Sequence, residues 1–320
     1  MTSVPHLGEL LALLTAVMWA VAVIFFKKSG ETVHPFALNL FKSVLGGVLI
    51  LATIWLMYGI ELPQMPRRDL LLLLASGALG IGIADTLFFK MLNRLGAALT
   101  SIVDCLYSPM VILAAMIWLG ETLSVIQVVG VALIISAVLE AVWVPRKAPP
   151  SPPVNGGGSE TPPGPPAQCG GGADRKHVWV GVLWGVAAMA CMALSIVIMK
   201  PMFERYSLLW VMEYRLAGGL LMLAVIFPLL RERRAILRSL SVRKGWGFTF
   251  GGAFIGQYLA LLLWAAGIKF TQASLAAAIN QTSNVFVFVL AGVFLKERLT
   301  KKRIIGIALA IVGVYLVTFG

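Results

Sequence analysis

Five ionisable side chains interrupt otherwise apolar stretches of this sequence: Lys42, Asp85, Asp104, Glu213 and Arg215. A charged side chain at the centre of a membrane span costs about 2.5 to 3.5 kcal/mol, so such a residue usually faces protein or water and has a partner. Because charges at such positions are functional by default, these five residues are the first candidates for binding a substrate or an ion.

The two kinds of charge suit two kinds of ligand group. Lys42 and Arg215 could hold anionic groups, whereas Asp85 or Asp104 could hold an amine or a proton. Burial in an apolar region allows a carboxyl group to bind and release protons near physiological pH. The alternative is structural: Lys42 neutralises one of the aspartates and Arg215 neutralises Glu213, which merely permits insertion into the membrane.

Two further segments carry residues that are unusual in an apolar helix. In "DCLYSPM", Pro109 lacks an N–H and clashes with the carbonyl of Cys105, which predicts a kink that frees that oxygen. In "NQTSNV", Asn280 and Asn284 are four residues apart and therefore share one face of a helix. Kinks and polar residues at mid-depth often line transport sites, although membrane helices also tolerate proline for packing alone. Both asparagines therefore join the candidate substrate-binding or ion-binding residues.

The elements that must position these residues are membrane helices. Hydrophobic residues make up 59% of the 320 positions, charged residues make up 12%, and the mean hydropathy is +0.90, which is far from the composition of a soluble domain. A helix needs roughly 20 apolar residues to cross the bilayer. We expect an all-α membrane protein with ten transmembrane helices, at about 7–27, 34–58, 70–92, 97–118, 123–144, 178–200, 207–230, 245–268, 273–294 and 301–319.

The candidate residues fall at similar depths in these expected helices. At a rise of about 1.5 Å per residue, Lys42, Asp85 and Asp104 each lie about 10 Å below one face of the membrane. Glu213, Arg215 and Asn280 lie at a similar depth below the opposite face, where the N-terminus lies. Two polar layers should thus border the middle of a hydrocarbon slab that is about 30 Å thick.

A Pro- and Gly-rich segment divides the chain into two halves. We expect residues 1–144 and 178–320 each to form a five-helix repeat, joined by a disordered linker over 145–177. Lys42 matches Arg215 at an offset of 173 positions, and "GIGIADTLFF" matches "FIGQYLALLL" at 174. An odd number of helices per half places the two halves in the membrane with opposite orientations. This is the inverted-repeat plan of many secondary transporters, whose substrate site lies between the halves.

A short motif also recurs in the two halves. "GETL" at 120–123 corresponds to "KERL" at 296–299, so that Glu121 and Glu297 are 176 positions apart. Gly120 suits a helix end, and Glu121 suits the first turn of the next helix. Lys296 replaces that glycine in the second copy. We therefore interpret the two motifs as surface hairpins on opposite faces of the membrane, outside the transport site.

With these motifs in register, the chain resembles the drug/metabolite transporter superfamily, specifically its EamA-type ten-span members. The resemblance covers both halves and omits only the linker. It implies export or exchange of small polar metabolites, amino acids or drugs, usually driven by an ion gradient or by a counter-substrate. The resemblance does not identify the substrate.

The sequence leads us to expect a secondary transporter of a small polar metabolite, working by alternating access in the bacterial inner (plasma) membrane. A lipid-linked sugar or phosphate-ester carrier of the same superfamily is the alternative within transport. A membrane scaffold that acts through the Pro-rich linker is the alternative from another class. We expect the partners to be a small-molecule substrate, a coupled proton or counter-substrate, and membrane lipid. We expect no nucleic acid partner and a monomer or a homodimer.

No enzymatic or metal chemistry is indicated by the sequence. The chain has no HExxH or GxSxG motif and no paired aspartate-rich prenyl-binding motif, so we expect no catalytic residue. The cysteines and histidines are scattered, which gives no spacing for a metal site, and we expect no cofactor.

Orientation in the membrane can be argued in two ways. Most basic residues outside the expected spans, including "RERRAILRSLSVRK", lie on the face opposite the N-terminus. The positive-inside rule then places both termini outside the cytoplasm, whereas members of the resembled family are usually drawn with both termini inside. The basic run could instead bind lipid headgroups or another anionic partner.

Overall fold

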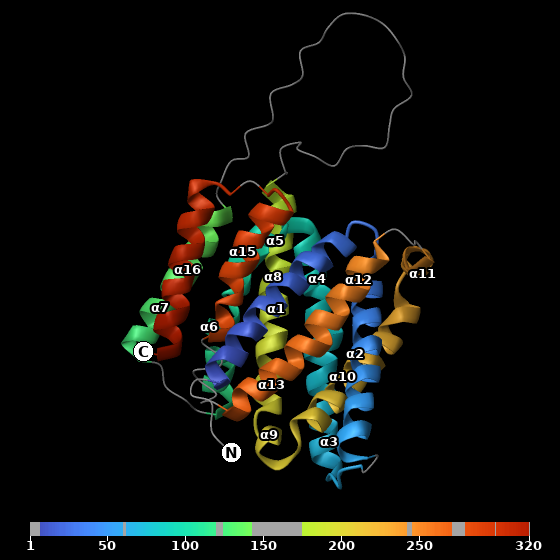
Figure 1. The fold of residues 1–320 in the computed structure, drawn as a ribbon. Coiled ribbons are helices and arrows are strands. Elements are labelled where there is room, and N and C mark those ends of the chain that lie inside the picture. The colour runs from blue at the N-terminus through green and yellow to red at the C-terminus, as the bar shows by residue number, and fades with distance from the viewer. Residues whose placement is uncertain are drawn as a thin grey trace, which may run out of the picture.

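The computed structural model describes residues 7–59, 62–119, 124–142, 175–241, 245–270, 279–297 and 299–319. Every regular element in these ranges is a helix, and no strand occurs among them (Figure 1). The prediction of an all-α protein is confirmed for this part of the chain. Seven helices are long and apolar enough to cross a membrane: Leu7–Ser29, Pro35–Tyr58, Arg67–Leu95, Val125–Val142, His177–Met202, Leu208–Leu229 and Trp246–Trp264. Two shorter apolar helices span Ala97–Val111 and Ile279–Phe294.

The elements before the linker follow the expected runs closely. They are α1 (Leu7–Ser29), α2 (Pro35–Tyr58), α3 (Arg67–Gly77), the π-helical segment η1 (Ala78–Ala84), α4 (Asp85–Leu95), α5 (Ala97–Asp104), α6 (Tyr107–Leu119) and α7 (Val125–Val142). The helix of "DCLYSPM" is interrupted at Cys105–Leu106, just before Pro109, as the clash of its ring with the helix predicts.

A second series of elements follows. It consists of α8 (Arg175–Met199), α9 (Met202–Arg205), α10 (Leu208–Ile226), the 3-10 segment η2 (Phe227–Leu229), α11 (Arg233–Ser241), α12 (Trp246–Gly252), the π-helical segment η3 (Ala253–Leu259), α13 (Ala260–Phe270), α15 (Ser283–Phe294) and α16 (Lys301–Phe319). Residues 143–174, which include most of the predicted linker, lie outside the described residues. The last three residues of the predicted linker belong to α8.

Helix ends are set by residues that the sequence displays. The α2 helix begins at Pro35, whose missing N–H is not needed in the first turn, and His34 Nδ1 accepts a hydrogen bond of 3.2 Å from the Phe36 N–H. Gly59 and Gly96 follow α2 and α4 with φ of 72° and 83°, values that favour glycine. Lys296 takes φ of 52° after α15, so it adopts the conformation that glycine provides at many helix ends.

Close helix contacts depend on small residues. A Cβ atom at Gly77 would meet the backbone carbonyl of Arg215, and one at Gly218 would meet that of Leu74, so α3 and α10 are in backbone contact. Gly130 and Gly313 bring α7 and α16 together in the same way. Figure 1 shows α7 and α16 side by side at one edge of the molecule, with α11 at the other edge.

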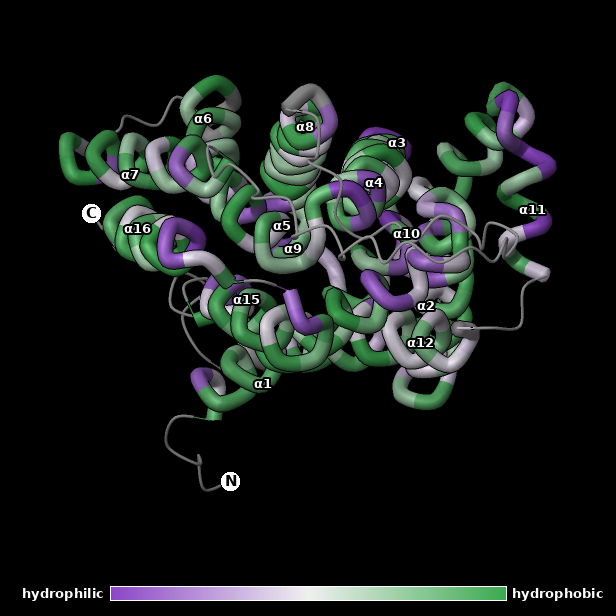
Figure 2. The backbone as a smooth tube through the Cα atoms, turned by 90° about the horizontal axis from the view of Figure 1, so that it is seen from above, coloured by the Kyte–Doolittle hydropathy of each residue, from purple (hydrophilic) through white to green (hydrophobic). Residues whose placement is uncertain are grey.

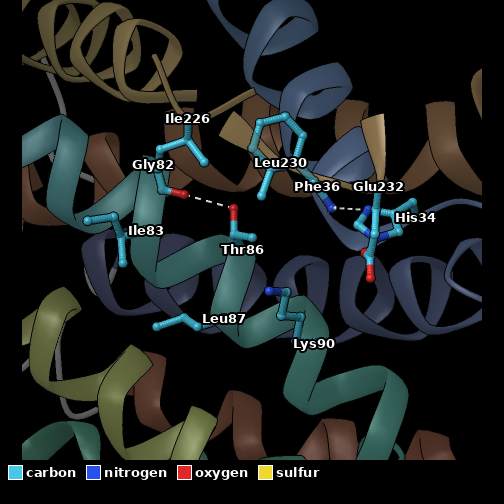
Figure 3. Close-up of a pocket in the computed structure, with 10 residues that line it drawn as sticks. All are labelled: His34, Phe36, Gly82, Ile83, Thr86, Leu87, Lys90, Ile226, Leu230 and Glu232. Atoms are coloured by element: carbon cyan, nitrogen blue, oxygen red, sulfur yellow. Dashed lines mark hydrogen bonds and ion pairs between the residues drawn. The ribbon is translucent and has the colours of Figure 1, made fainter. Parts of the chain in front are cut away.

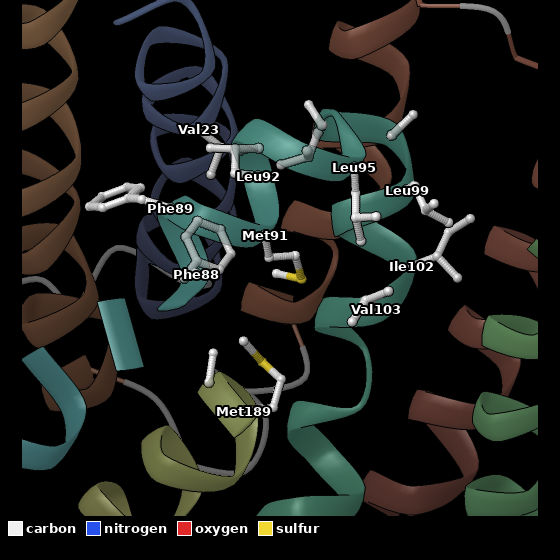
Figure 4. Close-up of a cluster of buried hydrophobic side chains, with 14 of the residues drawn as sticks. Val23, Phe88, Phe89, Met91, Leu92, Leu95, Leu99, Ile102, Val103 and Met189 are labelled. Carbon is white, nitrogen blue, oxygen red and sulfur yellow. The ribbon is translucent and has the colours of Figure 1, made fainter. Parts of the chain in front are cut away.

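The buried apolar side chains form two clusters. The larger joins α1, α4, α5 and α8, and Figure 4 shows part of it, including Met91 and Leu92 of α4 and Ile102 and Val103 of α5. The smaller cluster lies among α2, α3 and α10. In the view from above, the hydrophilic parts of the tube include α11 and turns of α4 and α10 (Figure 2).

Candidate functional site

Lys42 and Asp85 form a buried ion pair, as one of the two alternatives from the sequence predicts. The distance from Lys42 Nζ to Asp85 Oδ2 is 2.7 Å, and the two residues are 2% and 9% exposed. Lys42 Nζ also donates a hydrogen bond of 2.8 Å to Gln257 Oε1. Gln257 lies in η3, so a residue from the second half of the chain completes the coordination of a charge in the first half. As a neutral residue, Gln257 does not stand out in the sequence.

Asn39 holds the backbone that carries Asp85. Its side-chain amide is fully buried and donates to the carbonyls of Ile81 at 2.7 Å and Gly82 at 3.3 Å. It also donates to Thr86 Oγ1 at 2.9 Å. The accepting carbonyls belong to η1, where π-helical bonding displaces the regular helical pattern. Asp85 directly follows this segment, so Asn39 fixes the turn from which Asp85 reaches Lys42.

Arg215 is buried among neutral partners. It is 6% exposed, its Nε donates to Ser76 Oγ at 3.1 Å, and its Nη2 donates to Ser195 Oγ at 2.9 Å. The two serines each donate to the other's backbone carbonyl at 2.8 Å, which ties α3 to α8. Nη1 has only a weak contact of 3.8 Å with Met212 Sδ. Among the described residues no carboxylate bonds to this guanidinium.

The predicted alternative in which Arg215 neutralises Glu213 is wrong. The two residues are two positions apart on α10, and side chains at that spacing do not face each other. Glu213 instead points towards α2, where its Oε1 lies 3.5 Å from the position that a Cβ at Gly47 would occupy. Its Oε2 is buried and has no hydrogen-bond partner in the described part of the chain.

Asp104 lies where two interrupted helices meet. Asn284 is beside its carboxyl group, and Asn284 Nδ2 also approaches Cys105 Sγ at 3.5 Å. Gln281 Nε2 donates to Ser108 Oγ at 3.0 Å, so the break at 105–106 is linked to the turn at Thr282 in the second half. The other predicted asparagine, Asn280, has a buried Oδ1 without a partner among the described residues.

The Lys42–Asp85 pair, Arg215 with its serine partners, and Asp104 with Asn284 surround one region. Tyr107, at the start of α6, is within electrostatic range of both Arg215 and Asp104, and Asp85 is within range of Arg215. The structure thus brings Lys42 together with Asp85 and places Asp104 next to Asn284. Glu213 and Asn280 lie on their own, each with one unpartnered oxygen. The region combines two cations, Lys42 and Arg215, with the carboxyl groups of Asp85 and Asp104 and with several amides, which suits a ligand that has both polar and charged groups.

Comparison with known proteins identifies the family. The EamA-like transporter family matches residues 6–143 and again residues 179–319, which together cover most of the chain. This chain belongs to the EamA-like transporter family. A solved structure described as "Crystal structure of protein" shares 18% sequence identity with a TM-score of 0.59, and the match covers 97% of this chain and 95% of that one. It supports the fold alone. The comparison with curated proteins found no match.

Family membership confirms the resemblance drawn from the sequence. The EamA-like chain is a multi-pass integral membrane protein of the drug/metabolite transporter type, and proteins of this family are transporters and not enzymes. The repeated match also agrees with two related halves.

A cavity in the EamA-like chain lies away from the charged region. It has a volume of about 180 Å³ and is lined by α4, the start of α2 and the end of α10 (Figure 3). Phe36, Leu87, Ile226 and Leu230 supply apolar walls, and Lys90 lies at its side. None of the seven candidate residues lines this cavity.

Glu297 has a role beyond the surface hairpin that its motif predicts. Its Oε1 accepts a hydrogen bond of 2.7 Å from the Ala97 N–H, and its Oε2 accepts one of 3.1 Å from the Ala98 N–H. It therefore caps the first turn of α5 from the other half of the chain. A signal was present: α5 begins after Gly96, which has no side chain to cap it. The corresponding Glu121 lies outside the described residues.

Proposed function

We propose that this chain is a secondary transporter that exports or exchanges a small polar metabolite by alternating access. Its ten transmembrane helices would form two inverted five-helix repeats, residues 1–144 and 178–320, joined by a flexible linker over 145–177. We place it in the bacterial inner membrane as a monomer or homodimer. The double family match and the sequence offsets near 174 support the repeats.

Two structural correspondences also support this arrangement. π-helical segments occur at Ala78–Ala84 and at Ala253–Leu259, which is nearly the same offset. Such segments are rare and frequently mark functional sites. Two contacts between the proposed repeats join α2 to the second segment, η3: Lys42 bonds to Gln257, and Thr53 Oγ1 bonds to the Tyr258 hydroxyl at 2.8 Å.

The state of Arg215 is the single observation that carries the substrate class. A guanidinium buried in an apolar environment without an anion is costly, and the serine hydroxyls supply only neutral acceptors. We infer that the substrate supplies the anion, and that a carboxylate would bind Arg215 in a bidentate manner. Asp104 with Asn284 would then bind the substrate's amine. A molecule with both groups is an amino acid or a close derivative.

Lys42 distinguishes this proposal from the phosphate-ester alternative. A phosphate ester would need several free cations around it, but Lys42 is already bonded to Asp85 and Gln257. Glu213 is the candidate for a coupled proton because its carboxyl group has no cation bonded to it among the described residues. The scaffold alternative depends on the linker, which lies outside the described residues.

Ligand-induced thermal stabilisation of the purified protein tests the substrate class. We expect amino acids to raise the melting temperature, and we expect the corresponding amines and carboxamides, which lack the carboxylate, to bind roughly tenfold to a hundredfold more weakly. Arg215→Lys should lose most of this discrimination because a point charge cannot form the bidentate pair. If sugar phosphates stabilise the wild type and amino acids do not, the substrate class proposed here is wrong.

Uptake into vesicles tests the residue roles. Asp85→Asn, Asp104→Asn and Arg215→Ala should each lower uptake of the stabilising ligand, with Arg215→Ala the most severe. Glu213→Gln should preserve exchange of substrate on the two sides but abolish uptake driven by a proton gradient. Unaltered transport by all these variants would refute the site assignment. Loss of function on deletion of the linker alone would favour the scaffold.

A further inference from the structure

The side of the molecule around α11 combines a basic helix with an apolar cavity. Figure 2 shows α11 apart from the bundle, with hydrophilic residues along it. Its arginines and the arginine just before it are exposed: Arg231, Arg233, Arg234 and Arg238. None of them forms an ion pair within the described part of the chain. Their positive charge is therefore available to a partner.

The same helix is fixed to the bundle by an apolar residue. Ile236 is fully buried and belongs to the larger apolar cluster, whereas Leu237 is 54% exposed. Leu229, just before α11, is 77% exposed. A short helix with a buried anchor, exposed leucines and several arginines is typical of an element that lies at the membrane interface.

The cavity opens beside this helix. Leu230 and Glu232, the residues on either side of Arg231, line it together with Phe36, Leu87 and Ile226 (Figure 3). Lys90 Nζ also lies at the cavity and sits 5.5 Å from the centre of the Trp184 ring, where it lacks a carboxylate partner among the described residues. The acid of the lining, Glu232, is held by His34 at 3.2 Å. The apolar cavity thus lies next to Lys90 and to the chain segment that leads into α11, whose arginines form no ion pair among the described residues.

We propose that the cavity and α11 together form a binding site for an anionic phospholipid. The first methylenes of an acyl chain would contact the apolar walls, and the phosphate would be held by Lys90 and the arginines of α11. A neutral lipid could contact the apolar walls but would offer no net negative charge to the basic residues. A soluble anion could bind the basic residues but would leave the apolar walls without a partner. The site is separate from the transport region, so it stands or falls independently of the proposed substrate.

Lipid titration of the purified full-length protein tests the site. Native mass spectrometry or thermal shift with phosphatidylglycerol should give saturable binding, and phosphatidylcholine with the same acyl chains should bind at least tenfold more weakly. Glycerol 3-phosphate should produce no shift at matched concentration. Equal binding of both lipids would overturn the proposal, and so would a full effect of glycerol 3-phosphate, which would indicate a site for a soluble anion.

Variants distinguish a specific lipid-binding site from general attraction to the basic surface. Because each basic residue near an anionic lipid contributes about a fivefold effect, the triple variant Arg233→Gln, Arg234→Gln, Arg238→Gln should weaken phosphatidylglycerol binding on the order of a hundredfold. Lys301→Gln with Lys302→Gln is the matched control, since these lysines begin α16 at the same end of the molecule (Figure 1). An equal loss in this control would overturn the proposal.

Separate variants test the cavity and Glu232, the acidic residue of its lining. Leu230→Trp should fill the cavity and weaken lipid binding, whereas Leu229→Trp, at the exposed neighbouring position, should leave it unchanged. Glu232→Gln removes a negative charge from the lining and should tighten binding. Unchanged binding in Leu230→Trp, or weaker binding in Glu232→Gln, would contradict the proposed position of the lipid.

Discussion

At the scale of single residues, the Lys42–Asp85 pair places two opposite charges in the interior of the protein. Both groups are almost fully buried, and Gln257 supplies a neutral acceptor as well. Taking two charges out of water has a high cost that their mutual attraction only partly offsets, so such a pair is weak evidence for stability by itself. Its position between α2, α4 and the η3 segment of the other half favours a role in function.

Breaking the pair should cost more than removing it. Asp85→Asn leaves the Lys42 ammonium buried without its counter-charge, and we expect a loss of about 3 to 5 kcal/mol, seen as a lower melting temperature in detergent. The double variant Lys42→Met, Asp85→Asn should recover most of this loss while transport stays impaired. Additive effects of the two single changes in a double-mutant cycle would show that the residues are not coupled.

The sequence predicted some of these residues and missed others for a physical reason. Lys42, Asp85 and Arg215 stand out because charges are costly in an apolar span. Their partners Gln257, Ser76 and Ser195 are neutral and common in membrane helices, so only the packing of distant segments shows that they matter. The same lack of long-range information led to the wrong pairing of Arg215 with Glu213, which are close in sequence but face different helices.

At the scale of elements, α5 depends on a cap from the other half. Ala97 and Ala98 begin this helix, and their N–H groups bond to Glu297 alone among the described side chains. Glu297→Ala should therefore lower stability by about 0.5 to 2 kcal/mol, the range for loss of a helix cap. The melting temperature of Glu297→Gln, which keeps one acceptor oxygen, should lie between those of the wild type and Glu297→Ala. A melt of Glu297→Ala that coincides with the wild type would show that the cap contributes nothing.

The crossing of α3 and α10 depends on glycine at the contact. In Gly77→Ala the new methyl group would meet the Arg215 backbone carbonyl, which cannot move without displacing α10. We expect a loss of about 1 to 3 kcal/mol, typical of overpacking, together with weaker transport because Arg215 would shift. Gly247→Ala is the control, because nothing lies within 4 Å of a Cβ there. If both variants melt alike, close packing at Gly77 is unimportant.

Most helices followed from the length of the apolar runs, but most of their internal irregularities did not. The break before Pro109 was predicted because proline removes a donor and clashes with the preceding turn. The π segments η1 and η3 carry no such residue, and in η1 the shifted bonding is stabilised from outside by the Asn39 amide. Lys296 shows a related effect, because the turn after α15 imposes a left-handed conformation on a residue that disfavours it.

At the scale of the whole molecule, the two family-matched segments are joined through their polar residues. Lys42 with Gln257, Ser108 with Gln281, and the α5 cap by Glu297 all connect the first segment to the second. In an alternating-access transporter such contacts would have to break on one side while others form on the opposite side. We infer that they hold the state described here and that the substrate acts by competing for them.

Exchange across proteoliposomes tests this account most directly. Vesicles preloaded with an unlabelled amino acid should take up the labelled compound by counterflow. Arg215→Gln changes the anion site, and Gln257→Leu changes the contact between the repeats. Each variant should slow exchange by about tenfold or more. Lys301→Gln, at an exposed surface position, should exchange at the wild-type rate. Wild-type exchange in both site variants would contradict the proposal that these buried groups form the transport site.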